Sequence, residues 1–337
     1  MVAIAIRAIT ICPLSRAEFE IALVCALRLE YDAVCLFFDA FWDEDGDRYG
    51  RALGDCNTYT TVAAASLHHS YQGLRLAILV GICGGVPFPK GAADEILLGD
   101  VVVSQSVIQD TIEDNLSRPN KDIRSLLAIL ESEHGRERLQ QGTASYLAQL
   151  QDAARAKHRR TGYLYPGTRE DKLFNSGYRH KHHDPKICIC VCKDCQTRAD
   201  PVCEVALTAT CADLQCAASQ LIHRRRLKLK AEHEVNKDNQ AEVPAIHIGQ
   251  IASGDTVVKS GEDRDILAQE MNVIAFEMEG AGVWDELPCI IVKGVADYAD
   301  CHKNDTWQDY AAATAAAAMK ALLDRYVRTD RVASPRI

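Results

Sequence analysis

The chain has 337 residues, a formal net charge of −9 and a pI of about 5.7, with 47% hydrophobic and 25% charged residues. This balance argues against a basic nucleic-acid-binding protein and against wholesale disorder. The length suits one large α/β domain or two small ones. No apolar run reaches the ~18 residues of a membrane span. The N-terminus lacks the pattern of a secretory signal, and 14 cysteines are too few for a disulfide scaffold of this length, so we expect a cytoplasmic protein.

Short apolar runs alternate with helical patterns through most of the chain. In chain order, the predicted elements are a strand at 19–25, a helix at 29–41, strands at 74–80, 96–103, 245–252 and 273–276, a helix at 277–285, a strand at 289–295 and an Ala-rich helix at 306–326. This alternation predicts an α/β fold, a three-layer αβα sandwich around a mostly parallel or mixed sheet. We expect a single domain over 18–327, with poorly ordered tails at 1–17 and 328–337.

Residues 151–240 differ in composition from the rest of the chain. They hold 17 Lys or Arg against 11 Asp or Glu, six of the 11 His and seven of the 14 Cys. Because long apolar runs are also missing there, we interpret this stretch as a basic, Cys/His-rich insertion in the domain. Its basic run at 223–230 is typical of a solvated helix face, with binding to an anionic partner as the alternative.

A zinc site in the insertion is one hypothesis. Its ligands would come from Cys188, Cys190, Cys192 and Cys195, which follow histidines 180, 182 and 183. Cys192 and Cys195 have the two-residue gap of a zinc knuckle, but a second C-x-x-C pair is missing. Free surface thiols are therefore the alternative, and no resident cofactor is expected.

Glycine-rich or acidic segments follow several predicted strands. They are Gly81-Ile82-Cys83-Gly84-Gly85, Ser253-Gly254-Asp255, Glu277-Met278-Glu279 and Asp297. Because ligands bind beyond the carboxyl ends of the strands in such sheets, these segments predict one common site. Glycines let a backbone approach a ligand closely, yet neither a dinucleotide fingerprint nor a P-loop is present.

The residue types at these ends indicate their chemistry. A carboxylate of the 277–279 segment can accept hydrogen bonds from two ribose hydroxyls, and Met278 can pack under the sugar. The alternative is that these carboxylates only provide a favourable negative charge at the start of the following helix. Asp297 is a general-acid candidate because partial burial favours a protonated carboxyl group, and loop capping is its alternative. Glu30 lies just past the first strand, where an exposed helix glutamate is the default.

Together these residues resemble the nucleoside phosphorylase/nucleosidase superfamily. The resemblance is carried by the segments LVGICGGV at 79–86, GQIASGD at 249–255, AFEMEGA at 275–281 and GVADYAD at 294–300. It covers about residues 18–327 and is strongest to a fungal subgroup often found N-terminal to NACHT, ankyrin or tetratricopeptide repeats. Because the sequence ends at Ile337, it predicts a stand-alone domain.

The resemblance implies cleavage of the N-glycosidic bond of purine nucleosides. It assigns Asp297 to protonation of the base, Met278 and Glu279 to the ribose, and Glu30 to the attacking water. The further substrate-binding residues that we predict are Glu277, Cys83, Gly84, Ser253 and Asp255. Ala296 stands where the superfamily usually has a serine.

Hydrolysis and phosphorolysis are the two alternatives for this bond. The phosphorylases carry an arginine two residues before the first glycine of the central loop, where this chain has Leu79, and a Gly-Asp-Pro-x-Arg loop that residues 26–30 lack. A phosphate dianion needs fixed donors, and Arg28 is the one conceivable substitute. We therefore favour hydrolysis. Phosphate would be a co-substrate only if the chain is a phosphorylase, which transfers the glycosyl group to phosphate.

Two segments of the family pattern are missing, one after Thr61 and one after Gln109. The first is a strand with a Gly-x-Gly-Lys-type turn, and its loss would expose a sheet edge. A catalytically silent nucleoside-sensing or interaction domain, or a truncated splice or gene-model product, is therefore an alternative to an enzyme. The expected partner is a small-molecule nucleoside, with no nucleic acid and no membrane, and the chain would act as a monomer or a homo-oligomer.

Overall fold

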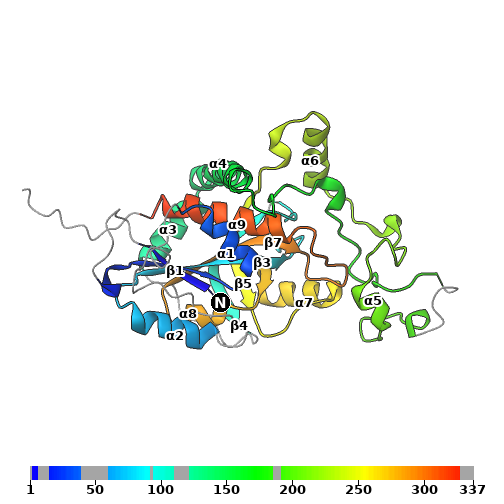
Figure 1. Ribbon diagram of the computed structural model, residues 1–337. Coiled ribbons are helices and arrows are strands. Elements are labelled where there is room, and N and C mark those ends of the chain that lie inside the picture. The colour runs from blue at the N-terminus through cyan, green and yellow to red at the C-terminus, as the bar shows by residue number, and fades with distance from the viewer. Residues whose placement is uncertain are drawn as a thin grey trace, which may run out of the picture.

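The computed structural model describes residues 2–6, 15–38, 60–91, 94–109, 121–184 and 191–326. Helices cover both faces of a central mixed sheet (Figure 1). Within the described residues its strands are β1 (Val2–Ile6), β2 (Ile21–Cys25), β3 (Leu76–Gly85), β4 (Val101–Gln109), β5 (Ile246–Ser253), β6 (Val273–Glu277) and β7 (Cys289–Asp297). The predicted α/β fold with a mixed central sheet is confirmed.

The strand order is β1-β2-β3-β6-β5-β4-β7, and β3 also pairs with β7, so that β3, β7, β4, β5 and β6 close into a ring. The pairs β2–β3, β3–β7, β4–β5 and β5–β6 are parallel, and β1–β2, β3–β6 and β4–β7 are antiparallel. Near its end β3 has two partners, because Gly84 lies opposite both Phe276 of β6 and Asp297 of β7. This closure brings three strand ends together at one point of the sheet.

The layers on either side of the sheet differ in composition. One contains α9 (Gln308–Leu323), which packs on β3, β4 and β7 and is covered by α1 (Arg28–Cys35) and α4 (Glu133–Ala156), with α3 (Lys121–Glu131) against α4. The other contains α8 (Gly280–Trp284) and α2 (Thr60–Ser70), while α7 (Gly261–Met271) packs beside β6. The small residues of α9 and β7 let these two elements pack very closely. A Cβ at Gly294 of β7, for example, would lie 1.9 Å from the carbonyl oxygen of Ala311 in α9.

The structure differs from the sequence prediction in two segments, the N-terminal residues 1–17 and the predicted strand at 96–103. Within the tail at 1–17 that was predicted to be poorly ordered, Val2–Ile6 pair antiparallel with β2 and form a strand beside it. The predicted strand at 96–103 begins only at Val101, because Gly99 adopts a φ of +82° and the Asp100 carboxylate accepts the Leu97 N–H at 2.9 Å. Of the two family gaps, Thr61 lies in α2, and residues 110–120 after Gln109 are outside the described residues.

The insertion is tied to the sheet by buried ion pairs. Its predicted start at residue 151 falls inside α4, and its later elements include α5 (Glu204–Thr208) and α6 (Arg225–Val235). Arg226 donates to both carboxylate oxygens of Asp100, and Arg224 lies 2.8 Å from Asp171, both 1% exposed. The basic run at 223–230 is therefore not simply a solvated face, because two of its arginines are structural partners of buried acids.

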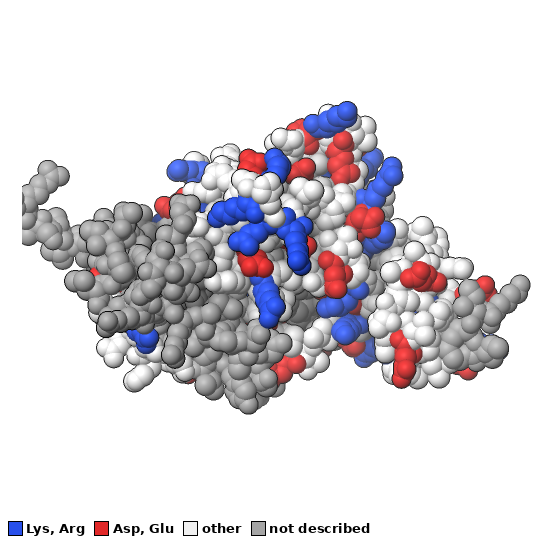
Figure 2. All heavy atoms as spheres, in the orientation of Figure 1, with Lys and Arg blue, Asp and Glu red and all other residues white. Residues whose placement is uncertain are grey.

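Two features of the described residues relate to the expectation that the chain binds neither nucleic acid nor a membrane: the surface charge and the character of the helices. Basic and acidic side chains are intermixed on the face shown in Figure 2. Among the described helices, none combines the length and the apolar character needed to cross a membrane.

Candidate active site

One cavity of about 340 Å³ lies where the ends of β3, β6 and β7 meet the turn between β2 and α1. Seven of the predicted site residues line it: Glu30, Cys83, Gly84, Glu277, Met278, Glu279 and Asp297. The lining also includes Thr256, Val257, Val258, Ala299, Lys303 and Gln308, none of which was among the predicted site residues.

Glycine is required at the centre of this site. A Cβ on Gly84 would lie 3.0 Å from Oδ1 of Asp297 and 2.9 Å from Cβ of Ala299. Contacts of this length force neighbours to shift, so the absence of a side chain at Gly84 is what lets the end of β7 approach β3. A Cβ on Gly81 would similarly lie 2.3 Å from Oε1 of Glu30. The glycines of this segment therefore leave the space that the neighbouring carboxylates occupy.

Glu30 is a buried, fixed carboxylate rather than the exposed helix residue that is usual at such a position. It is 1% exposed in the first turn of α1. Its Oε2 accepts the N–H groups of Ala26 and Leu27, each at 2.8 Å, and its Oε1 accepts that of Ile82 at 2.8 Å. Burial raises its pKa, against the opposing effects of Lys293 and of these N–H groups. Three donors thus hold one carboxylate beside the cavity.

Lys293 is a further residue of this site that was not predicted from the sequence. It lies in the middle of β7, fully buried, with its Nζ 2.8 Å from Oε2 of Glu279 and 3.6 Å from Oε2 of Glu277. Burial by itself lowers the pKa of Lys293, but the carboxylates of Glu279, Glu277 and Glu30 leave that pKa raised. The available signal was a single lysine inside the apolar run at 289–295, because an unpaired lysine is almost never fully buried.

Glu277 and Glu279 have different environments although only Met278 separates them. Glu277 accepts the N–H groups of Glu279 at 3.1 Å and Gly280 at 2.9 Å, so it caps the start of α8, and burial raises its pKa. Burial also acts to raise the pKa of Glu279, but the ammonium of Lys293 more than offsets this and the pKa is lowered. Glu279 is therefore the ionised carboxylate at the cavity, and Met278, 42% exposed, provides an apolar wall beside it.

Asp297 ends β7 and has partners of two kinds. Its Oδ1 accepts the N–H of Ala299 at 2.8 Å, which is the loop-capping role predicted as the alternative for this residue. Its Oδ2 lies 3.3 Å from Nζ of Lys303, and the side chain is 16% exposed. The loop after β7 thus places an acid and an ammonium side by side at one end of the cavity.

Other predicted residues lie outside the cavity lining. Ser253 is buried, and its Oγ accepts the N–H of Ala281 at 2.9 Å, so it supports α8. Asp255 is exposed, and the three residues that follow it line the cavity instead. Arg28, the conceivable phosphate ligand, is exposed and is not among the lining residues.

The cysteines of the predicted zinc cluster are only partly described. Cys188 and Cys190 lie outside the described residues. Cys192 and Cys195 are buried rather than free at the surface. The Sγ of Cys192 accepts the N–H of Cys203 at 3.3 Å, and that of Cys195 donates to the carbonyl of Asp200 at 3.8 Å. Each of the two thiols thus has a hydrogen-bond partner within the insertion, and zinc binding by this cluster stays a prediction.

Comparison with known proteins agrees with the motifs. The chain is 27% identical over 339 residues to a nucleotide-binding leucine-rich repeat (NLR)-like protein of Hyaloscypha variabilis, covering 92% of this chain and 30% of that protein. It is 36% identical over 84 residues to aminodeoxyfutalosine nucleosidase of Helicobacter pylori, covering 23% of this chain and 36% of the nucleosidase. The match thus spans about a third of the length of each relative. No family model matches the chain. The predicted resemblance to nucleosidases is confirmed by the match to aminodeoxyfutalosine nucleosidase over 84 residues, whereas association with NACHT or other repeats stays a prediction.

Solved structures of similar fold include two bacterial nucleosidases. Futalosine hydrolase of Helicobacter pylori aligns over 91% of this chain and 97% of its own at 15% identity and a TM-score of 0.45. The 5′-methylthioadenosine/S-adenosylhomocysteine nucleosidase of Neisseria meningitidis, in complex with methylthio-immucillin-A, aligns over 91% and 99% at 15% identity and a TM-score of 0.42.

Proposed function

We propose that this chain, a relative of nucleosidases, hydrolyses the N-glycosidic bond of purine nucleosides. The observation that carries the proposal is the convergence of Glu30, Glu279 and Asp297 on one cavity, with buried Lys293 behind it. The cavity volume of about 340 Å³ falls in the range of small-molecule sites.

The ribose lies against Glu279 and Met278. Lys293 keeps Glu279 ionised, so both of its carboxylate oxygens serve as acceptors for neighbouring hydroxyl groups. The same negative charge stabilises the positive charge that develops on the sugar as the bond to the base breaks. Met278 contributes an apolar surface for the sugar.

The base lies at the Asp297 end of the cavity. A departing purine carries developing negative charge, and a proton donor there makes it a better leaving group. Asp297 and Lys303 form a pair at this end, with 3.3 Å between Oδ2 and Nζ. In this proposal Asp297 protonates or hydrogen-bonds the base, and the ammonium of Lys303 is a second donor within reach.

The attacking water is held by Glu30. Its raised pKa, caused by burial, moves this carboxylate toward the range of an effective general base at neutral pH. The charge of the lining also favours water over phosphate as the nucleophile. Both cations that the structure describes at the cavity, Lys303 of the lining and Lys293 behind it, are already paired with carboxylates, so neither is left to neutralise a phosphate dianion.

The test uses purified full-length chain with adenosine, inosine or guanosine, with and without phosphate, and follows release of free base by chromatography. We expect release that does not depend on phosphate. Asp297→Asn and Glu279→Gln should lose most activity, whereas Asp152→Asn, which changes an exposed acid of α4, should not. Release that occurs only with phosphate would contradict hydrolysis, and full activity of both site variants would contradict the assigned site.

A second candidate function is a nucleoside-sensing domain without turnover. It is favoured by the 27% identity to an NLR-like protein over 92% of this chain, because the proposed cavity would then report a ligand rather than convert it. Isothermal titration calorimetry with the same nucleosides distinguishes the two. Binding without base release, abolished by Glu279→Gln, would support sensing and contradict catalysis.

A further inference from the structure

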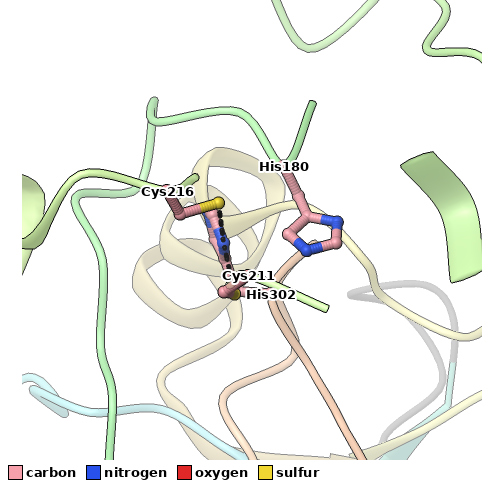
Figure 3. Close-up of side chains that lie close together, drawn as sticks. All are labelled: His180, Cys211, Cys216 and His302. Atoms are coloured by element: carbon pink, nitrogen blue, oxygen red, sulfur yellow. Dashed lines mark hydrogen bonds between the residues drawn. The ribbon is translucent and has the colours of Figure 1, made fainter. Parts of the chain in front are cut away.

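Four potential metal ligands meet at the junction between the insertion and the loop after β7. His180, Cys211 and Cys216 come from the insertion and His302 from the loop (Figure 3). One ligand atom from each residue can be chosen so that all four atoms lie within 4.8 Å of one another. Three of the residues are half-buried and His302 is buried. We propose that these four side chains bind one structural zinc ion.

The spacing between the ligand atoms fits a tetrahedral ion. Zinc bonds of about 2.3 Å to sulfur and about 2.0–2.1 Å to nitrogen, at the tetrahedral angle, place a sulfur and a nitrogen ligand ~3.6 Å apart. Nδ1 of His302 lies 3.5 Å from Sγ of Cys211 and 4.0 Å from Sγ of Cys216. An ion at the centre therefore requires only small movements of the side chains.

Both imidazole rings are already oriented as ligands usually are. The Nε2 of His302 lies 3.0 Å from the carbonyl oxygen of Tyr178, which leaves its Nδ1 facing the two sulfurs. The Nδ1 of His180 lies 3.1 Å from the carbonyl oxygen of Ala206, which leaves its Nε2 available. Metal-binding histidines commonly donate their other ring N–H to such a carbonyl, because that bond fixes the tautomer and the ring orientation.

The donor set selects the metal and its role. Two thiolates with two imidazoles form the Cys₂His₂ combination of structural zinc sites, and four protein ligands leave no open position for catalysis. The two thiolate charges neutralise those of a divalent ion, so the complex can be partly buried at little electrostatic cost.

Such a crosslink would stabilise the part of the insertion around residues 192–216. Within the described residues, its satellite core contains only three buried side chains, Cys192, Ala206 and Leu214. A core this small contributes little stability, and small units of this kind are commonly held by metals or disulfides. Since His302 is next to Lys303, which pairs with Asp297 at the cavity, the ion would also fix the loop that forms one wall of the proposed active site.

The experiment measures zinc in full-length protein purified under reducing conditions and dialysed against metal-free buffer. We expect about one zinc per chain by mass spectrometry of the metal. Cys211→Ser should lose most of it. The matched control is Cys195→Ser, which removes another cysteine of the same insertion and should leave the zinc in place. Cobalt(II) added to the metal-free protein should give the visible absorption of tetrahedral, thiolate-bound cobalt, and this absorption should be missing in Cys211→Ser.

A measurement on the wild type covers the case in which the variant fails to fold. Removal of zinc by a chelator should increase amide hydrogen exchange in residues 204–216 and 300–303, and added zinc should restore the protection. Metal-free protein with reduced thiols would overturn the proposal, as would a Cys211–Cys216 disulfide found by intact mass. Zinc lost in Cys195→Ser but kept in Cys211→Ser would assign the ion to the other cysteine cluster and would also overturn it.

Discussion

The sharpest prediction concerns Lys293→Met, which removes the buried cation but keeps an unbranched side chain of similar length. Lys293 is fully buried, 2.8 Å from Glu279 and 3.6 Å from Glu277. Without it, the buried carboxyl group of Glu277 and the partly exposed one of Glu279 must either remain charged without this counterion or take up protons. Breaking a buried ion pair in this way costs about 3–5 kcal/mol.

This cost converts into a thermal shift. At about 2.1 cal/mol/K per residue, unfolding 337 residues carries an entropy of roughly 0.7 kcal/mol/K. A loss of about 3–5 kcal/mol therefore lowers Tm by roughly 4–7 °C. Lys293→Arg, which keeps the charge, should lose less. Lys320→Met is the matched control, because Lys320 pairs with Asp324 near the surface and such pairs contribute below about 1 kcal/mol.

The loss in Lys293→Met should also depend on pH. Without the cation, the folded-state pKa values of Glu277 and Glu279 rise above their unfolded values. Groups of this kind favour the folded state at low pH, and that stabilisation is lost as the pH rises through the folded-state pKa. The Tm difference from wild type should therefore be larger at pH 8 than at pH 5, as measured by differential scanning calorimetry. An equal difference at both pH values, or none at pH 8, would refute the role assigned to Lys293.

Three further predictions concern single acids. Asp297→Asn should lower kcat for base release by about 10²–10⁴-fold with unchanged Tm, and a variant that keeps most of its turnover would remove Asp297 from the chemistry. Glu30→Gln should slow hydrolysis more than it weakens nucleoside binding. Because burial raises the pKa of Glu30 and its base form accumulates as the pH rises, the wild-type rate should increase with pH through that pKa, and the variant should lack this limb. Asp100→Asn should destabilise the chain by about 3–5 kcal/mol, since it breaks the ion pair between the fully buried Asp100 and the partly buried Arg226. Because Arg226 and His247 hold the pKa of Asp100 below its usual value against the effect of burial, this stabilisation is present above about pH 4 and declines as the pH falls further, which urea denaturation across pH would show.

Much of the architecture follows from local patterns in the sequence. The alternation of apolar runs and helical segments predicted the α/β class and most core strands, since a buried parallel strand must be apolar on both faces. Glycines and acids after those strands predicted one site, and Glu30, Glu279 and Asp297 do line one cavity. These features depend on short stretches of chain, so they are visible without a structure.

The remaining features depend on contacts between distant segments. The second partner of β3 near Gly84 and the structural use of Arg226 each join residues far apart in the sequence. Lys293 is closer in sequence to Glu277 and Glu279, but it meets them only because β7 folds back into the sheet beside the end of β6. The same holds for the proposed zinc ligands, because His302 lies 86 residues beyond Cys216 and no local spacing connects them. Periodicity reports which face of an element is apolar, whereas the partner of a buried charge is decided only when the sheet closes and brings that partner within a few ångströms.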